Sequence, residues 1–564
     1  MFFPRNICIF FENQQRFCNF AERLENMNKS KKYIKSAKRQ EEPRKAEAYT
    51  KKRFGLWNIQ FYPLLFLLLW LFCSVIYGDV FYMSQQTSYF AWDKTLMNFI
   101  LSQDWGWLYA AGRFLLLGFH YPLLGGCMLA LMLTLCAWLI DYLVALPAKL
   151  RLFAALPPFA FLSYFVSLDY SVNYHRETSL LTALPFAALL LLLLASVIKR
   201  IVTRKIISNP LKLNVGTHRN ILVNNLGACC VFLCISSFCF FQRDDLIRTC
   251  RMTKMLEQSD WQAMIDEALG ARRPSRSVAA YYAIALAETG QLESRAFEIP
   301  YDYPNRKVRE KDGRMTDGIS IYTLDADFYA GLANTSYHNC MEIAVTNGPQ
   351  IFLLKRMARA ATMNGEKRLA WKYLTMIDRN PFEHKFVERY KNYLANLKSM
   401  YAEPEFAHVV NKKPVYDDFE QNYRTPLFLG YNVVLTQGAS QEALNASLMA
   451  TLYSKELDAF MARVRFLDMS QPLPEYYSQA VMLRALKDKS ILKYFPSING
   501  EMTRARLMSF VKEAKPYLRD KKEEGRKLLS KDWQNYYPYY LYLENIPTEE
   551  QIEEQEKQEK GGVN

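Results

Sequence analysis

Residues 179–198 read SLLTALPFAALLLLLLASVI, an apolar run without a single charged side chain. An α-helix needs about twenty apolar residues to cross the hydrocarbon core of a bilayer, and this run has that length. Lys199 and Arg200 follow it at once, which is typical of a span that ends at the cytoplasmic surface. The run therefore predicts a transmembrane helix.

Similar runs lie only in the first 241 residues: 56–77, 122–143, 221–241 and a shorter one, 152–168, in which Pro157 and Pro158 would kink a helix. The stretch 105–121 is also apolar, but Arg113 stands at its centre. An unpaired Arg in the middle of a bilayer is costly. We therefore predict a membrane domain over residues 54–241, with about five spans and an interfacial or re-entrant helix at 105–121.

Basic residues predict the orientation of these spans. Residues 27–53 hold eleven Lys and Arg against three Glu, and residues 199–219 hold six Lys and Arg and no acid. Cytoplasmic loops carry the excess of positive charge in membrane proteins, and five spans place both segments in the cytoplasm. A sixth span at 105–121 would place residues 199–219 outside. We expect a multi-pass protein of a bacterial inner membrane, with a cytoplasmic N-terminus and a periplasmic C-terminal domain.

The two ends of the chain have the composition of disordered segments. Residues 1–53 are expected to form a basic, largely disordered cytoplasmic N-terminus, and residues 1–26 lack the features of a signal peptide. Met27 is a more natural start of the protein than Met1. Residues 546–564 are rich in Glu, Gln and Lys and are expected to be a disordered charged tail.

Residues 242–545 have the pattern of a soluble helical domain, because apolar residues recur every three or four positions. In three places a glycine separates two such helices and an alanine follows five or six residues later: Gly290 and Ala296, Gly365 and Ala370, Gly438 and Ala443. The glycines lie 75 and 73 residues apart, close to two periods of a repeat of about 34 residues. We predict an all-α fold, a polytopic membrane helix bundle followed by tetratricopeptide-like repeats. The alternative is an irregular helical domain whose helices end at glycine caps.

Three segments carry a resemblance to a known group of proteins. They are AAGRFLLLGFHYPLLGG at 110–126, GEKRLAWKYL at 365–374 and YYPYYLYLEN at 536–545. On these segments the chain resembles an uncharacterised family of bacterial inner-membrane proteins, in which N-terminal spans precede a helical, tetratricopeptide-like C-terminal domain. The resemblance implies this topology and no particular activity.

The sequence contains no phosphate-binding loop, dinucleotide fingerprint, HExxH motif or paired CxxC motif. Candidate site residues therefore come from the loops expected outside the membrane: Asp79, Asp93, Asp104, Arg113, His175 and Glu177. Such carboxylates suit a metal or a lipid-linked phosphate, and the outline resembles membrane glycosyltransferases that use polyprenyl-phosphate sugars. The alternative is that these residues cap helices and pair with each other at the surface. Arg113 is expected to pair with Asp79, Asp93 or Asp104, because a charge among apolar residues needs a partner.

Cysteines and tyrosines give weaker indications. Cys250 and Cys340 are the only cysteines after residue 241, and an oxidising periplasm leaves open whether they are bridged. The cysteines of the apolar runs are expected to pack as small hydrophobic side chains, so we predict neither a metal nor a cofactor. Tyrosines cluster at 281–282, 476–477 and 536–542, where they either pack between helices or line a groove.

The sequence favours a binding protein over an enzyme. A five-span anchor would hold a periplasmic repeat domain that binds a protein or another component of the cell envelope, and membrane lipid is a further expected partner. Nucleic acid is excluded as a partner, because much of the excess positive charge lies beside the first span and no nucleic-acid-binding module accompanies it. The alternative is an envelope transferase that acts on a lipid-linked substrate through the outside-loop carboxylates.

Overall fold

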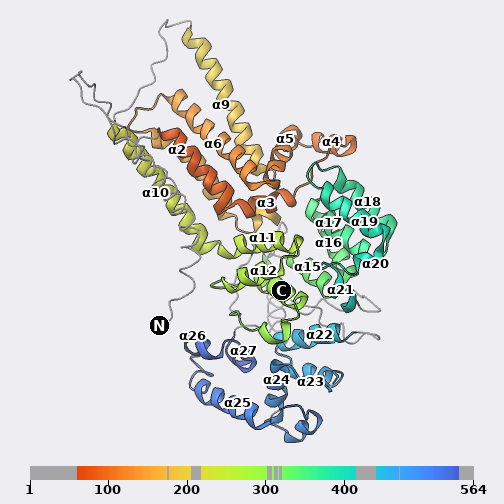
Figure 1. The fold of residues 1–564 in the computed structure, drawn as a ribbon. Coiled ribbons are helices and arrows are strands. Elements are labelled where there is room, and N and C mark those ends of the chain that lie inside the picture. Colours follow the sequence, from red (N-terminus) through yellow and green to blue (C-terminus); the bar gives the residue numbers. More distant parts are fainter. Residues whose placement is uncertain are drawn as a thin grey trace, which may run out of the picture. The chain divides into compact units, whose positions relative to one another are not determined.

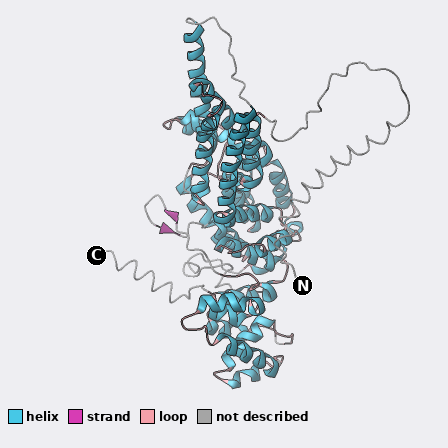
Figure 2. Cartoon of the chain, turned by 90° about the vertical axis from the view of Figure 1, so that its left-hand side faces the viewer, coloured by secondary structure: helices cyan, strands magenta, loops and turns pink. Residues whose placement is uncertain are grey.

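The computed structural model describes residues 60–174, 177–204, 218–301, 308–309, 315–316, 321–413, 440–468, 470–498 and 500–544. All of these belong to one unit that starts at Ile59, and the domain boundary predicted at residue 242 falls inside it. The predicted terminal segments 1–53 and 546–564, with Met27, lie outside the described residues. The described elements are helices, apart from two antiparallel two-residue strands, β1 (Val308–Arg309) and β2 (Met315–Thr316) (Figure 2). The all-α class is therefore confirmed.

Three described helices are long and apolar enough to cross a membrane: α6 (Pro122–Val144), α9 (Leu180–Arg204) and α10 (His218–Gln242). They correspond to three of the five predicted spans. α9 and α2 (Phe61–Leu71) both pack along α6 (Figure 1).

The other two predicted spans differ from a straight helix. α2 continues into a π-helical turn, η2 (Phe72–Ile76), and the chain then bends by 65° into α3 (Gly78–Gln86), so this pair is at most a broken span. η4 (Arg151–Ala155) and α7 (Leu156–Ser167) form a shorter apolar segment. The bend coincides with a change in composition along the chain, because α2 is wholly apolar and α3 carries polar residues.

The stretch predicted as interfacial forms α5 (Gly106–Leu116) and the short η3 (Leu117–His120), preceded by α4 (Lys94–Leu101). α5 packs closely on α9 through Gly112, where a Cβ atom would come within 2.7 Å of the Ala183 Cβ. The Thr182 hydroxyl donates a hydrogen bond of 2.7 Å to the Gly112 carbonyl. The glycine is needed here because the two backbones approach each other directly.

One end of the apolar helices gathers the basic residues. The Lys199 ammonium donates to the carbonyls of Tyr142 and Leu143, at 2.7 and 3.0 Å, which joins the end of α9 to the end of α6. Asn224, near the start of α10, donates to the Ala148 carbonyl at 2.8 Å. The opposite end, where α6 begins and α10 ends, faces the remaining helices.

The remaining helices follow one another in chain order. They are α8 (Ser171–Tyr174), α11 (Asp244–Glu257), α12 (Trp261–Leu269), α13 (Arg276–Glu288), α14 (Leu292–Arg295), α15 (Ile321–Tyr329), α16 (Ala333–Asn347), α17 (Ile351–Met363), α18 (Lys367–Asp378), α19 (His384–Ala395), α20 (Leu397–Met400), α21 (Ala407–Lys412), α22 (Gln441–Tyr453), α23 (Leu457–Val464), α24 (Glu475–Ala485), η7 (Lys489–Tyr494), α25 (Gly500–Ala514), α26 (Lys522–Trp533) and α27 (Tyr537–Leu543). α16 to α19 pack side by side in sequence order.

Two of the three predicted glycine turns are present. Gly290 (φ 66°) follows α13 and Gly365 (φ 72°) follows α17, so both residues use the left-handed backbone that glycine adopts without strain. Ala296 and Ala370 are buried after them, as small residues at a close helix contact should be. Gly438 lies outside the described residues. The turns are confirmed, and the repeat interpretation stays a prediction.

The clustered tyrosines pack between helices. Tyr281, Tyr477 and Tyr537 are fully buried, and the Phe297 ring lies 4.8 Å from Tyr476 and 4.4 Å from Tyr540 between ring centroids. Cys250 and Cys340 are buried free thiols and form no disulfide. These side chains therefore contribute to the core.

Candidate functional site

The end of α3 is a polar segment buried against helices far along the sequence. Ser84, Gln85, Gln86, Thr87 and Ser88 are all buried. The Ser88 carbonyl accepts a backbone hydrogen bond of 3.2 Å from the amide of Ile351, the first residue of α17. The neighbouring Tyr89 hydroxyl donates to the Met376 carbonyl of α18 at 2.9 Å. This segment therefore connects the apolar helices to α17 and α18.

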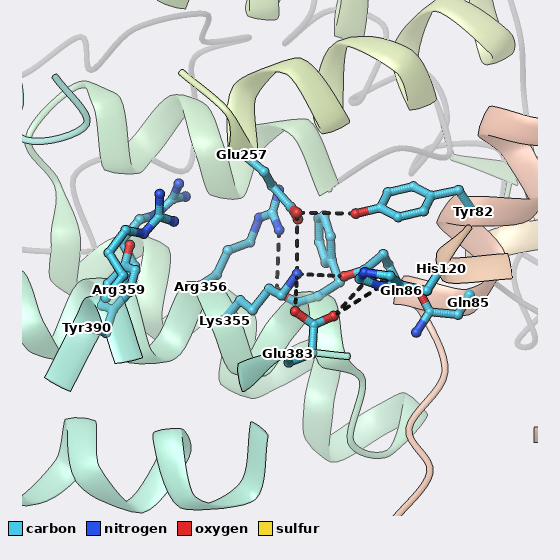
Figure 3. Close-up of polar contacts among 12 residues, drawn as sticks. Tyr82, Gln85, Gln86, His120, Glu257, Lys355, Arg356, Arg359, Glu383 and Tyr390 are labelled. Carbon is cyan, nitrogen blue, oxygen red and sulfur yellow. Dashed lines mark hydrogen bonds and ion pairs between the residues drawn. The ribbon is translucent and has the colours of Figure 1, made fainter. Parts of the chain in front are cut away.

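Lys355 of α17 is the buried cation at this connection (Figure 3). Its ammonium lies 2.9 Å from Glu383, 3.3 Å from Glu257 and 3.1 Å from the Gln86 side-chain oxygen. Burial alone would lower the pKa of Lys355, but the two carboxylates outweigh it and raise the pKa. Burial would likewise raise the pKa of Glu257, but Lys355 and Arg356 outweigh it and lower that pKa. Lys355 and Glu257 are therefore held in their charged forms.

A second buried ion-pair cluster is formed by Arg356 and Arg359, which follow Lys355 on α17. The Asp325 carboxylate, which is wholly inaccessible, accepts a hydrogen bond of 3.0 Å from Arg356 Nε and one of 2.7 Å from Arg359 Nη2. Arg356 Nη2 donates a further bond of 2.5 Å, and the Tyr281 hydroxyl donates a fourth of 3.2 Å. Burial would raise the pKa of Asp325, but the two guanidinium groups outweigh it, and the pKa is lowered. One aspartate therefore holds both arginines in place.

These clusters form one wall of a cavity of about 540 Å³, which we call the junction cavity. The lining residues are Tyr82, His120, Tyr121, Pro122, Lys254, Glu257, Gln258, Lys355, Arg356, Arg359, Phe382, Glu383, Lys385, Phe386, Arg389 and Glu405. They include six Lys and Arg against three Glu, and each glutamate already contacts a cation. The cavity therefore has an excess of positive charge available to a ligand.

Several of the basic groups are open to a further partner. Within the part of the chain that the structure describes, Lys254 and Lys385 form no ion pair. Arg359 Nε and Arg389 Nε are buried and have no hydrogen-bond partner there. Buried polar atoms are almost always hydrogen-bonded, so both donors lack an acceptor, and a ligand in the cavity would reach them only after the side chains that cover them shift.

His120 lines the cavity at the start of α6. Its ring stacks on Phe382 at 5.1 Å between centroids, and its Nδ1 lies 3.8 Å from the Glu383 carboxylate. Burial lowers the pKa of His120 and Lys355 adds to this effect, although Glu383 acts in the opposite direction. A neutral imidazole next to a carboxylate can accept a proton.

The residues predicted as a site from the outside loops are not brought to this cavity. Asp79 pairs with Arg251 at 3.0 Å, and Asp93 caps α4 and pairs with Arg379 at 2.7 Å. Asp104 is exposed in the turn before α5, and His175 lies outside the described residues. Among the described members, Asp79 and Asp93 thus bind different arginines, only Arg113 and Glu177 are brought into contact with each other, and a catalytic role for the set stays a prediction.

Arg113 has a carboxylate partner, but the predicted partner is wrong. Its guanidinium forms two hydrogen bonds with Glu177, at 3.0 and 3.2 Å, and makes none with Asp79, Asp93 or Asp104. The reason is the packing of α5 on the start of α9, because Glu177 lies just before α9 and next to Gly112 and Arg113. Burial would raise the pKa of Glu177, but Arg113 outweighs it and lowers the pKa.

The Arg113→Leu substitution is expected to lower the free energy of unfolding by about 1 kcal/mol, because the pair is only partly buried and solvent screens it. The measurement is thermal unfolding of the purified protein in detergent. Glu177→Gln should produce a similar loss, and the double variant should lose little more than either single variant. Fully additive losses would show that the two side chains do not act as a pair.

Sequence reasoning missed the residues of the junction cavity. The signal was present in α17, where IFLLKRMARAATM places Lys355, Arg356 and Arg359 within a strongly apolar helix. Asp325 likewise lies in the apolar stretch before residue 330. Charges in an apolar helix indicate burial with a partner, but nothing in the sequence shows which acid faces which base.

Acid is expected to remove the stability that Asp325 provides. Its pKa lies below the ordinary value of 3.8, so the folded state binds this proton less tightly than the unfolded state does. The contribution is complete above the ordinary pKa and is lost as the pH falls toward the lowered one. Thermal unfolding at a series of pH values checks this, with Asp325→Asn as reference. The stability difference between wild type and variant should shrink on acidification, and a constant difference would contradict the prediction.

The fold and the site together define a class of helical protein. Its long apolar helices are suited to a membrane, and a buried ion-pair network joins them to a basic cavity with the volume of a small ligand. Residues 54–209 and 168–544 match the model of a family of unknown function, DUF6057, and the chain belongs to this family. No curated protein and no solved structure matches the chain. The expected membership of an uncharacterised family is thereby confirmed.

Proposed function

We propose that the protein is a multi-pass protein of a bacterial inner membrane that binds an anionic component of the cell envelope in the junction cavity. The observation that carries this proposal is the charge of the cavity, six basic side chains against three glutamates, beside the start of the apolar helix α6. In this proposal the helical domain lies in the periplasm. Its tetratricopeptide-like arrangement supplies the binding surface.

The distribution of charge along the apolar helices supports this orientation. Lys199 is bonded to the end of α6, and Arg219 is the second residue of α10, whose Asn224 is bonded to Ala148 just after α6, so these basic residues lie at one end. The junction cavity lies at the other end, where α6 starts at Pro122. Under the positive-inside rule, the basic end is cytoplasmic and the cavity is periplasmic.

An anionic ligand fits the cavity better than a protein surface does. The hollow has the volume of a small-molecule site, which is typically about 300–1,000 Å³. Its unsatisfied donors come from arginine side chains, whose planar groups suit carboxylate and phosphate oxygens. We therefore infer that the partner presents a charged group that enters the cavity.

The test has two parts. Alkaline phosphatase fused after residue 545 should be active and green fluorescent protein should be dark, which places the domain in the periplasm. Thermal unfolding of the purified protein should then shift upward with sodium pyrophosphate, relative to sodium chloride of equal ionic strength. The shift should fall in Lys254→Glu and persist in Lys367→Glu, which changes an exposed lysine of α18 outside the cavity. No shift, or an equal shift in both variants, would contradict the proposal.

A second candidate function is transfer of a group from a lipid-linked substrate. It is favoured by the neutral His120 beside Glu383, in the same cavity as the basic residues. The outside-loop carboxylates Asp79 and Asp93 are each engaged by an arginine, so His120 is the better candidate base. Release of polyprenyl phosphate from a polyprenyl-phosphate sugar, lost in His120→Gln, would support this function. If the wild type releases no polyprenyl phosphate, the transferase function is rejected and only the binding function remains.

A further inference from the structure

We propose that the ligand of the junction cavity is a lipid with a phosphate headgroup, whose phosphate enters the cavity while its hydrocarbon chains lie against the start of α6. This inference rests on the proposed function, and it names the class of ligand for the same site. The argument has three parts: the donors for the phosphate, the apolar surface for the chains, and the aromatic residues between them.

The phosphate donors come from several different helices. Lys254 lies on α11, Arg359 on α17, and Lys385 and Arg389 on α19, and all four line the cavity. A phosphate group has oxygens that point in several directions, so donors from separate helices can each bind one, whereas a carboxylate offers two oxygens in one plane. Arg359 is more than nine-tenths buried, and its Nε still lacks a hydrogen-bond partner among the described residues.

The basic residues of the cavity outnumber its acidic residues, although Glu257 and Glu383 share the single cation Lys355 and so keep one net negative charge. Glu257 and Glu383 both face Lys355, and Glu405 accepts a short hydrogen bond of 2.5 Å from Tyr390. Figure 3 shows Glu257 and Glu383 converging on the Lys355 ammonium, with Gln86 completing the group. Lys254 and Lys385 form no ion pair with these acids among the described residues. Their positive charge is therefore available to a ligand in the cavity.

The surface for the hydrocarbon chains begins at the cavity itself. Tyr121 and Pro122 line the cavity and lead directly into α6, where Leu123 and Leu124 are 62% and 53% exposed. The adjacent Trp70 indole donates a hydrogen bond of 3.1 Å to the Leu123 carbonyl. Exposed leucines bordered by Trp and Tyr are the pattern of a helix end at the lipid interface.

Aromatic rings separate the polar and apolar parts of the site. The Phe382 ring stacks on His120 and meets the Tyr121 ring edge-on at 5.6 Å between centroids. A cavity of about 540 Å³ has room for a headgroup and not for long acyl chains as well. A phosphate lipid would place its head on one side of these rings and its chains on the other.

The experiment compares three probes that share parts of the ligand. Dioleoyl phosphatidic acid has both phosphate and chains, dioleoylglycerol has the chains alone, and glycerol phosphate has the phosphate alone. Binding of each to the full-length protein in detergent is measured by native mass spectrometry. We expect phosphatidic acid to bind at least about tenfold more tightly than either of the other probes, because it alone engages both parts of the site.

Two substitutions show whether the lipid occupies the cavity. Lys385→Glu, at the start of α19, should weaken binding of phosphatidic acid by about tenfold, because it replaces a charged donor by a repelling group. Lys367→Glu is the matched control, since Lys367 is an exposed lysine at the start of the neighbouring helix α18. Equal binding to both variants would place the lipid elsewhere and overturn the inference.

The probes also separate this inference from the proposed function. If glycerol phosphate binds as tightly as phosphatidic acid, the lipid inference fails and anion binding stands. If dioleoylglycerol binds as tightly as phosphatidic acid, or if no probe binds, both fail.

Discussion

Asp325→Asn is expected to lower the free energy of unfolding by about 3–5 kcal/mol, because it removes the carboxylate that two buried guanidinium groups share and leaves Arg359 with the longer Glu405 contact alone. The substitution keeps the shape of the side chain and removes only its charge. Arg356 and Arg359 line the cavity but are almost fully buried, so water compensates for the lost carboxylate only in part. The melting temperature in detergent, followed by tryptophan fluorescence, measures the effect.

A matched control distinguishes a buried aspartate from an exposed one. Asp458 also pairs with an arginine, Arg484, at 2.9 Å, but its side chain is 80% exposed. Asp458→Asn should leave the melting temperature nearly unchanged, since exposed ion pairs contribute little. Equal melting temperatures for Asp325→Asn and Asp458→Asn would show that the cluster on α17 does not hold the fold together.

The second large effect is expected at Lys355. Lys355→Met keeps an unbranched side chain but leaves the buried Glu383 and the partly buried Glu257 without their shared cation, at a cost of about 3–5 kcal/mol. Hydrogen exchange should also rise at Gln86, because Lys355 connects α3 to α17. Both the melting temperature and the exchange rates measure the change.

The pH dependence of the Lys355→Met variant tests its physical cause. Without the ammonium, only Arg356 opposes the effect of burial on Glu257, so the pKa of Glu257 rises in the folded state. The variant then loses stability as the pH rises through this range, so its deficit relative to wild type should be smaller in acid. Adding Glu383→Gln should restore part of the loss. A double variant no more stable than Lys355→Met would show that the unpaired carboxylates are not the cause.

The fold could be predicted from the sequence where the residues of a single segment determine its structure. The apolar runs that became α6, α9 and α10 are such segments, and so are the turns at Gly290 and Gly365, because length, hydropathy and glycine conformation are local properties. The bend after η2 was not predicted, although the polar residues of α3 mark the place where the apolar run ends. Membrane insertion, orientation and the repeat register stay predictions.

The candidate site could not be assembled from the sequence, because its parts are widely separated along the chain. Gln86 and Lys355 are 269 residues apart and Glu257 and Lys355 are 98 apart, yet each pair forms a hydrogen bond. The acidic residues of the predicted outside loops were chosen as site candidates because they lie beside apolar runs. The structure instead uses Asp79, Asp93 and Glu177 to hold arginines, while the basic cavity is built by α11, α17 and α19.

The buried polar run at the end of α3 bears on how the protein can be prepared for study. A fragment that begins after α10 is the obvious choice for crystallisation of a soluble part. It would lack Gln86, which binds Lys355, and Tyr89, which binds α18. It would also remove Tyr82, His120 and Tyr121 from the cavity wall. Such a fragment would expose a surface that is buried in the intact protein and would lack four of the sixteen residues that line the cavity. Ligand screens therefore belong on the intact chain in nanodiscs or detergent.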